Sequence, residues 1–375
     1  MSVMQLTVTV KLKTPPAQHA ALVQTLRTCN SACDDISRAA FAAGTFRQYD
    51  LHALVYHPVK AQTKLNANHV VRAIAKVAHA YKLDTRMQRT FAPLGGIELD
   101  KDLLTWKVDA QTISINTVQG RLHLGFLCSS EQKALLQGKK GQTDLLLRDG
   151  AFYLSCAVTV AEAEPFIPEG VIGIDLGIVN VATDSEGNRY TGEAVKRVRK
   201  RCRRLRQELQ AKKTRSARKR MAKRRRKESR FVRDVNHCIS KTLVGMALNR
   251  KKALAIERLQ GIRERGNRLN RVMRTELNNW AFAQLKSFLA YKCRRAGVPL
   301  IEVDARYSSQ QCSRCGHTER ANRPSQEVFC CRYCCFQAHA DVNAALVLEA
   351  RVTLSTGPRF YLAALAARGG QAVRL

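Results

Sequence analysis

The N-terminal part of the chain shows two kinds of apolar periodicity. Residues 5–13 alternate apolar and polar side chains, which predicts a β-strand with one buried face. Pro15 and Pro16 then open a predicted helix, because proline is tolerated in the first helical turn. A second helix is predicted over residues 68–82. The buried stripe expected along the first helix consists of Leu22, Leu26, Cys29, Cys33, Ile36 and Ala40. Two cysteines of this stripe could form a metal pair, but their place on it favours a role in the core.

Short strands with turn residues between them follow. Residues 112–117 and 121–126 are predicted to pair, and so are residues 145–147 and 151–160, which flank a good hairpin turn at 148–150. We expect these strands to form a small antiparallel barrel or sheet that the N-terminal strand joins. The helical segment, residues 14–85, is then an insertion between residues 1–13 and 86–166 of one β-domain.

The second half of the chain predicts a mixed α/β domain over residues 167–307. Residues 171–176 form an apolar strand ending in Asp175, and residues 253–256 form another that ends at Glu257. A hairpin with its turn at residues 184–188, an amphipathic helix over 280–295 and a strand over 299–303 complete the domain. Residues 337–355 add a last segment, and residues 356–375 are expected to be poorly ordered.

The charge of the chain indicates a polyanionic partner. Its 64 Lys and Arg against 30 Asp and Glu give a formal net charge of +34 and a pI of about 10.2. A compact fold with this much like charge repels itself unless a polyanion such as nucleic acid neutralises it. No apolar run approaches the roughly 18 residues of a membrane span, so no membrane partner is expected. Thirteen cysteines without a secretory signal indicate the reducing cytoplasm.

Lys and Arg are densest between residues 196 and 230, where they make up more than half of the sequence. Val195, Val198, Cys202, Leu205 and Leu209 keep a helical stripe there, so a basic helical hairpin over 195–245 with one packed face is favoured over a disordered arm. The candidate nucleic-acid-binding residues lie in this hairpin and in the helix at 68–82: Arg72, Lys76, Lys82, Lys196, Arg197, Lys200, Arg203, Arg204, Lys212, Lys213, Arg218, Arg224 and Arg225.

Residues 308–336 contain two C-x-x-C pairs, Cys312 with Cys315 and Cys331 with Cys334. Two such pairs about fifteen residues apart are typical of a tetrahedral zinc site, and four thiolates make a closed structural site for one Zn²⁺. Gly316 would allow the first knuckle a positive φ. The alternatives for the second pair are the flanking thiols, and two histidines could also substitute: Cys330, Cys335, His317 and His339.

Two acids stand where an acid is unusual, Asp175 and Glu257 at the ends of apolar strands. A third, Asp341, lies at a predicted helix start, where the helix dipole favours its charge. Each has a structural explanation, as a strand-end residue, an ion-pair partner or a helix cap. Together they supply the carboxylates that two-metal phosphodiester hydrolysis needs, with two ions about 3.5–4 Å apart. Oxygen ligands favour Mg²⁺ or Mn²⁺. We therefore expect a catalytic site that holds two such ions.

The order of these motifs resembles the TnpB family, transposon-encoded RNA-guided endonucleases similar to type V CRISPR effectors. The motifs are GIDLG at 173–177, IERL at 256–259, SSQQCSRCG at 308–316, CRYC at 331–334 and ADVNAA at 340–345. Cys335 departs from the family pattern, because glycine is usual there, and this leaves the choice of zinc ligands open.

The resemblance implies an RNase H-like (RuvC) nuclease domain with an inserted zinc ribbon, and a wedge-like N-terminal β-barrel interrupted by a helical recognition insert. Asp175, Glu257 and Asp341 would be its catalytic metal ligands. It also implies a guide RNA from the transposon end, a double-stranded DNA target beside a short adjacent motif, and a prokaryotic, nucleoid-associated protein.

Three other functions fit parts of the sequence. A guided DNA-binding repressor would keep the fold without cleavage, but all three acids are present here. An autonomous transposase would join DNA without RNA. An actin-like ATPase would use GIDLG as a phosphate loop, but this leaves the cysteine pairs unexplained.

Overall fold

The computed structural model describes residues 2–177, 179–258 and 282–355. The chain divides at Ala161 into two compact units, Ser2–Ala161 and a second unit that starts at Glu162. The expectation of a poorly ordered tail at 356–375, and the first two residues of the helix predicted at 280–295, lie outside the described residues. No helix in the described part of the chain is long and apolar enough to cross a membrane.

The N-terminal unit is built on a seven-stranded antiparallel sheet in the order β2-β6-β7-β1-β5-β4-β3. The N-terminal strand does join it, because β1 pairs with β7 along most of its length and with β5 at its end. Both predicted hairpins are confirmed, β4 with β5 and β6 with β7. The strands are β1 (Val3–Lys13), β2 (Ile97–Leu99), β3 (Leu104–Lys107), β4 (Thr112–Thr117), β5 (Gly120–Leu127), β6 (Lys139–Arg148) and β7 (Ala151–Ala161).

Three helices follow β1 and pack on one another: α1 (Pro16–Ala42), α2 (Gln48–Gln62) and α3 (Ala67–Tyr81); a short helix, α4 (Ser130–Gln137), follows β5. The predicted stripe of α1 is buried throughout, so Cys29 and Cys33 are core residues. Burial raises the pKa of both thiols to about 12. The sequence did not predict α2, which contains Pro58 and has a weak apolar stripe of Leu51, Val55 and Val59.

The second unit contains a five-stranded sheet in the order β10-β9-β8-β11-β12. β8 pairs with β9 antiparallel and with β11 parallel, and β11 pairs with β12 parallel. The predicted hairpin is the pair β9 and β10. The strands are β8 (Gly170–Asp175), β9 (Asn180–Asp184), β10 (Arg189–Thr191), β11 (Lys252–Glu257) and β12 (Leu300–Val303).

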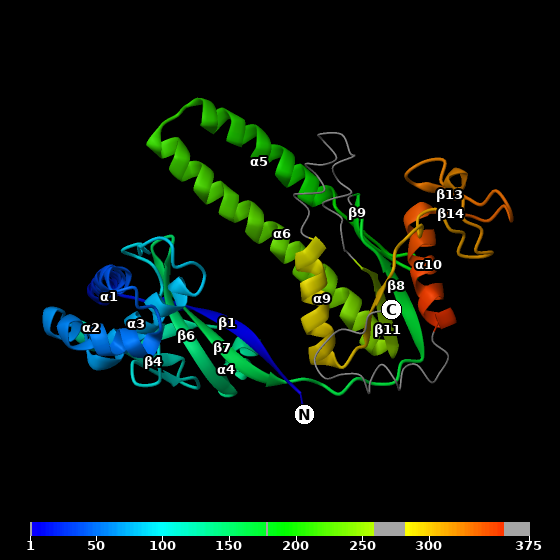
Figure 1. Ribbon diagram of the computed structural model, residues 1–375. Helices are drawn as coiled ribbons and strands as arrows, with labels where there is room; N and C mark the ends of the chain where they lie inside the picture. The colour runs from blue at the N-terminus through cyan, green and yellow to red at the C-terminus, as the bar shows by residue number, and fades with distance from the viewer. Residues whose placement is uncertain (1, 178, 259–281, 356–375) are drawn as a thin grey trace. The chain divides into compact units, whose positions relative to one another are not determined.

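Helices cover this sheet, and a small cysteine-rich ribbon adjoins it (Figure 1). A long basic hairpin is formed by α5 (Glu193–Ala211) and α6 (Arg215–Asn249). The C-terminal half of α6 and α9 (Phe282–Ala296) pack together and share a core with β8 and β11. The other face of the sheet meets α10 (Ala340–Ser355) through Leu348 and Val352. The ribbon contains the 3₁₀ turn Arg320–Asn322 and the strands β13 (Val328–Cys330) and β14 (Gln337–His339).

Candidate metal centres and nucleic-acid surface

Asp175 and Glu257 end two neighbouring parallel strands. In the register of β8 and β11, Ile174 is the partner of Ile256, so the two acids are the next residues on each strand. Neighbouring strands lie about 4.8 Å apart, and residues at matching positions of a parallel pair point to the same face. The two carboxylates therefore leave the same sheet edge side by side.

A close approach between β8 and α10 brings the third acid to this edge. A Cβ built on Gly173 would lie 1.9 Å from the carbonyl oxygen of Ala345, so only glycine allows the helix to pack so tightly. Asp175 is two strand residues beyond Gly173, about 6.7 Å, and Asp341 is four helical residues before Ala345, about 6 Å. The distance from Gly173 to Asp175 along β8 is thus close to the distance from Ala345 to Asp341 along α10. Each acid also lies on the same face of its element as the residue of the Gly173–Ala345 contact.

The three carboxylates interact electrostatically. The pKa of Asp175 is raised from 3.8 to about 8, first by burial and then by the negative charges of Glu257 and Asp341. The positive charge of Arg323 acts in the opposite direction. A carboxyl group surrounded in this way is costly to ionise unless a cation compensates the charge. The site is therefore short of positive charge.

Asp341 is held by two side chains that the sequence did not single out. Arg323 donates to Oδ1 at 3.1 Å, and Asn180 of β9 donates through Nδ2 to Oδ2 at 2.9 Å. Arg323 lies in the ribbon, between the two C-x-x-C pairs. A lone arginine in a chain this basic gives no signal in the sequence, because its role depends on where the ribbon meets α10.

The three acids fit divalent ions by donor chemistry and by charge. Carboxylate oxygens are the ligands that Mg²⁺ and Mn²⁺ prefer, and the mutual repulsion that raises the pKa of Asp175 is relieved by added positive charge. In the described residues the acids do not form a group whose ligand atoms all lie within 4.8 Å of one another; the four cysteines do. The carboxylate oxygens of Asp341 instead accept hydrogen bonds from Arg323 and Asn180.

The zinc motif forms a closed cluster of four cysteines. One ligand atom from each of Cys312, Cys315, Cys331 and Cys334 lies within 4.8 Å of all the others. The Sγ atoms of Cys312 and Cys334 are 3.7 Å apart, and those of Cys315 and Cys331 are 3.6 Å apart. A tetrahedron with Zn–S bonds of about 2.3 Å has edges of about 3.8 Å, so the cluster fits zinc.

The residues considered as alternative zinc ligands lie outside the four-cysteine cluster or make other contacts. Cys330 and Cys335 are outside the cluster, and Cys335 adopts φ +56°, the conformation for which glycine is usual. Gly316 has φ +78°, as predicted for the first knuckle. The ring of His317 lies 3.1 Å from a carboxylate oxygen of Glu319. His339 accepts the backbone N–H of Asp341 through Nδ1.

The ribbon is tied to α10 by Asn343, which belongs to the ADVNAA motif. Its Oδ1 accepts the backbone N–H of Ser313 at 3.0 Å, and its Nδ2 donates to the carbonyl of Gln311 at 2.8 Å. Both partners flank Cys312, so the first knuckle is bonded to the helix that carries Asp341. The position of the third acid thus depends on the folded ribbon.

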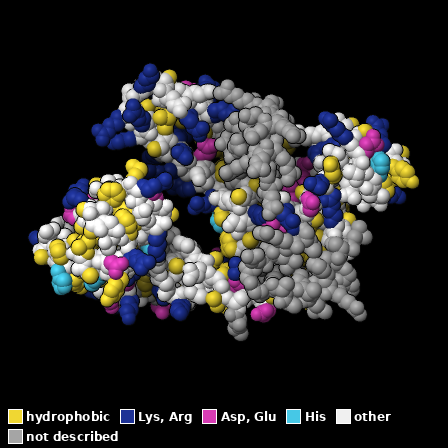
Figure 2. All heavy atoms as spheres, in the orientation of Figure 1, with side chains coloured by type: hydrophobic (Ala, Val, Ile, Leu, Met, Phe, Trp, Pro, Cys, Tyr) yellow, Lys and Arg dark blue, Asp and Glu magenta, His cyan; other side chains and the backbone are white. Residues whose placement is uncertain are grey.

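The predicted basic hairpin is present and presents most of its charge to solvent. Figure 2 shows Lys and Arg side chains gathered over the far end of this hairpin. Of the hairpin residues predicted to bind nucleic acid, Lys196 and Arg224 are half-buried; the exposed ones are Arg197, Lys200, Arg203, Arg204, Lys212, Lys213, Arg218 and Arg225. This surface suits a phosphate backbone.

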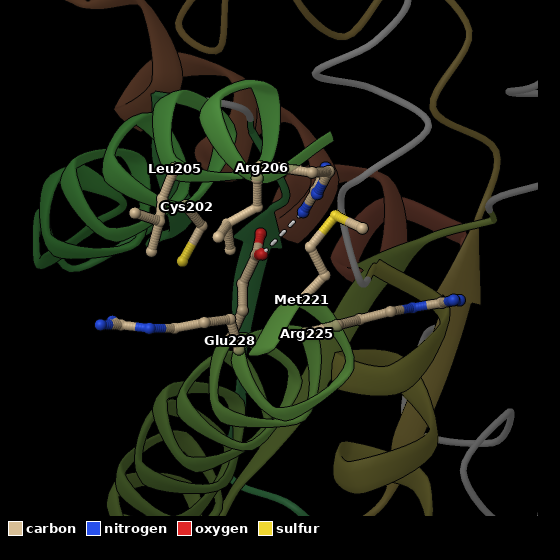
Figure 3. Close-up of a pocket in the computed structure, with 8 residues that line it drawn as sticks. Cys202, Leu205, Arg206, Met221, Arg225 and Glu228 are labelled. Atoms are coloured by element: carbon tan, nitrogen blue, oxygen red, sulfur yellow. Dashed lines mark hydrogen bonds and ion pairs between the residues drawn. The ribbon is translucent and has the colours of Figure 1, made fainter. Parts of the chain in front are cut away.

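The inner face of the hairpin is packed, as its stripe predicted. Val195 and Leu209 are buried. Figure 3 shows Arg206 of α5 directed at Glu228 of α6, with Cys202 nearby. The ion pair measures 3.1 Å, and burial, with the adjacent Glu228 carboxylate, raises the pKa of the Cys202 thiol. This interior holds the helices together, and on the outer surface Arg204 pairs with Glu208 of the same helix at 3.2 Å.

The three basic residues predicted on α3 differ in environment. Arg72 pairs with Glu98 at 3.0 Å and with Asp100 at 3.7 Å. The ammonium of Lys76 donates to Oδ1 of Asn30 at 2.6 Å, to a backbone carbonyl at 2.8 Å, and lies over a phenyl ring. Lys82, just past the helix end, is exposed. The first two charges are engaged within the fold.

Two family models match the chain. Residues 155–261 match the model described as a probable transposase, and residues 282–348 match the Cas12f1-like TNB domain. Together these segments contain the three acids and the four clustered cysteines.

Similar proteins match about a third of the chain. The CRISPR-associated endodeoxyribonuclease Cas12f1 of Sulfoacidibacillus thermotolerans is 37% identical over 120 residues, 32% of this chain and 27% of the relative. The TnpB-like protein MJ0751 of Methanocaldococcus jannaschii is 33% identical over 122 residues, 32% of this chain and 43% of the relative. The matched segments are therefore less than half of either relative's length.

The fold is similar to that of a solved structure, the cryo-EM structure of a Cas12f1–sgRNA–target DNA complex. The match has a TM-score of 0.55 at 15% identity and covers 88% of this chain and 82% of the other. It shows the likeness of the fold to a type V effector. The two family models and these relatives support the resemblance of the chain to the TnpB family.

Proposed function

We propose that this protein is an RNA-guided endonuclease that cuts double-stranded DNA beside a short adjacent motif. Its nuclease domain would be RNase H-like (RuvC), with Asp175, Glu257 and Asp341 as the catalytic ligands. In this arrangement base pairing with the guide reads the sequence, and the protein holds backbones and reads the short motif. The guide would derive from the transposon end.

The observation that carries this proposal is the meeting of three acids from separate parts of the chain. Asp175 and Glu257 share one sheet edge, and the close packing of α10 on Gly173 directs Asp341 to it. The raised pKa of Asp175 supports a site made for cations. A strand-end residue, an ion-pair partner and a helix cap, each placed for its own reason, would not be expected to converge.

Two Mg²⁺ or Mn²⁺ ions bound there would activate a water and stabilise the leaving 3′ oxygen. The residues of the chain have separate tasks. Asp175 and Glu257 supply oxygens from the rigid sheet, and Asp341 supplies oxygens from α10. Asn180 and Arg323 orient Asp341, and Arg323 also adds positive charge beside the scissile phosphate's expected position. The zinc ribbon holds Arg323 in place.

The hairpin of α5 and α6 would bind the phosphates of the guide RNA or of its duplex with the target. Its exposed arginines and lysines account for much of the net charge of +34. A polyanion on this surface would relieve the repulsion between them.

The test is cleavage of plasmid DNA by the protein purified with its co-expressed RNA. Cleavage should require magnesium or manganese and a target that matches the RNA, and Asp175→Ala should abolish it while keeping RNA and DNA binding. The matched control is Asp234→Asn, an exposed acid on α6, which should cut normally. Full cleavage by Asp175→Ala with magnesium contradicts the proposed centre.

The description of one matching model as a probable transposase favours a second candidate, an autonomous transposase. That protein would join the ends of its element to target DNA without RNA. Strand-transfer products formed by RNase-treated protein would support it. Loss of all DNA processing after RNase treatment supports the RNA-guided nuclease. Target binding by wild-type protein without any cut in either metal would instead indicate a repressor.

A further inference from the structure

Tyr307 has an unusual backbone conformation for a bulky aromatic residue. Its φ is +60°, in the left-handed region that favours glycine. Its side chain is also 60% exposed. A strained backbone that presents a large ring to solvent gains nothing from core packing, so another interaction is needed to explain it.

The conformation is fixed by the surrounding chain. Arg351 of α10 donates to the backbone carbonyls of Asp304 and, at 2.8 Å, of Arg306, and at 2.6 Å to the side chain of Gln311. The carbonyl of Tyr307 itself accepts the backbone N–H of Gln311 at 2.9 Å. Strained residues that are held from several sides occur most often at functional sites.

The turn leaves the sheet at the edge that carries the acids. Val303, the last residue of β12, is the register partner of Glu257, and its carbonyl accepts the N–H of Arg258 at 2.8 Å. Tyr307 is only four residues further along. It therefore stands at the junction between the proposed catalytic edge and the first zinc knuckle.

The side chain of Tyr307 is available for a ligand. In the described part of the chain its hydroxyl has no hydrogen-bond partner and its ring has no ring partner. The neighbouring Arg306 is exposed. An exposed ring with a cation beside it is the combination that binds unpaired nucleic acid, by stacking on a base and pairing with a phosphate.

We propose that Tyr307 is a substrate-positioning residue whose ring stacks on a base of the single strand that enters the site of the three acids. This inference rests on the proposed nuclease function. The backbone strain is then the cost of directing the ring outward at this edge, and Arg351 maintains it.

The experiment compares Tyr307→Phe, Tyr307→Gly and the wild type as full-length protein with its RNA. Single-stranded DNA carrying 2-aminopurine at successive positions is bound in an Asp175→Asn background, so that it is not cut. We expect quenching at one position with Tyr or Phe and its loss with Gly. In the cutting-competent background, Tyr307→Gly should lower kcat/KM by about 5- to 150-fold, whereas Tyr307→Phe should stay near wild type.

Thermal unfolding separates positioning from a structural role. Tyr307→Gly should raise Tm while it loses quenching and cleavage, because glycine relieves the positive φ. The control is Lys251→Gly, which has φ +49° at the opposite end of β11; it should raise Tm and leave cleavage unchanged. Unchanged quenching and cleavage by Tyr307→Gly overturn the proposal, and so does a fall in Tm that accounts for both losses.

Failure of the two proposals can be told apart. If wild-type protein cuts no DNA but Tyr307-dependent quenching persists, the nuclease proposal fails and the stacking role stands. If the wild type cuts and Tyr307→Gly shows full quenching, the stacking role fails alone.

Discussion

The guanidinium of Arg323 lies 3.1 Å from Oδ1 of Asp341, so a cation from the zinc ribbon contacts the third acid of the proposed centre. Its charge also lowers the pKa of Asp175, against the larger opposing effects of burial, Glu257 and Asp341. Arg323 therefore connects the cysteine-rich ribbon to the three acids of the proposed centre.

Removal of this charge should make the proposed centre more negative. In Arg323→Ala the pKa of Asp175 should rise further, so the pH profile of cleavage should shift to the alkaline side. Above this pKa the variant should need less magnesium for half-maximal cleavage, because a competing cation has left Asp341. Arg323→Lys, which keeps the charge without the planar fork, should stay closer to the wild type in both measurements; an unchanged pH profile and metal requirement in Arg323→Ala would contradict the assignment.

Asp175 should make the protein less stable as the pH rises when no magnesium or manganese is bound. Its folded-state pKa of about 8 lies above the ordinary 3.8, so between these values the folded state binds more protons than the unfolded state. Without added magnesium or manganese, and with zinc retained in the ribbon, the free energy of unfolding should therefore fall as the pH rises toward 8, and Asp175→Asn should remove much of this fall. At pH 8 the Asp175→Asn variant should be more stable than the wild type by an amount on the order of 1–2 kcal/mol, and each kcal/mol corresponds to about 2–4 °C in Tm.

Magnesium should reverse that pH effect, which gives a control within the same measurement. Added Mg²⁺ should raise the Tm of the wild type at pH 8 by mass action and leave Asp175→Asn nearly unchanged. Equal shifts in both proteins would mean that the ion binds elsewhere.

Gly173→Ala should destabilise the packing of α10 on β8. The added methyl would meet the carbonyl oxygen of Ala345 at 1.9 Å and the backbone nitrogen of Glu349 at 2.8 Å, and backbone cannot move aside as a side chain can. We expect a loss of about 1–3 kcal/mol or more in denaturant unfolding, together with loss of cleavage. The control is Gly245→Ala in α6, where nothing lies within 4 Å; it should gain about 0.5–1 kcal/mol.

Zinc content should distinguish the ligands from the neighbouring cysteines. Cys312→Ser and Cys331→Ser should lose the metal and unfold the ribbon, measured as zinc per chain by elemental analysis. Cys330→Ser and Cys335→Gly should each retain one zinc. The second should also raise Tm, because Cys335 has φ +56°. Zinc loss in Cys330→Ser with retention in Cys331→Ser would assign the second pair differently.

Basic residues that bind nucleic acid should affect affinity, whereas basic residues that pair within the fold should affect stability. The triple alanine variant of the exposed Lys212, Lys213 and Arg218 should weaken RNA binding and reduce the salt slope of log K by about 2, with Tm unchanged. Arg72→Ala should instead lower Tm, because it leaves Glu98 without its partner. A large loss of affinity in Arg72→Ala at unchanged Tm would restore its predicted nucleic-acid role.

Local features of this chain were predictable because local patterns determine them. Alternation gave the strand pairs of the N-terminal sheet, and an acid at the end of an apolar strand drew attention to Asp175 and Glu257. The cysteine spacing predicted the zinc ligands, and the short distances between the four sulfur atoms support this choice.

Features that depend on distant contacts were not predictable. Arg72 and Lys76 looked like other surface cations, since their partners Glu98 and Asn30 are 26 and 46 residues away. Arg323 gave no signal for the same reason. The helix α2 was missed because Pro58 interrupts its pattern, and only packing against α1 and α3 stabilises such a segment.

The order of the three acids along the chain has a consequence for protein synthesis. Asp341 follows the last clustered cysteine, so a ribosome delivers two acids, then the zinc ribbon, and only then the third acid. Under the proposed function, a nascent or prematurely released chain that ends before α10 contains two carboxylates and cannot cut. Under this proposal, incomplete copies of the chain would leave the cell's own chromosome uncut.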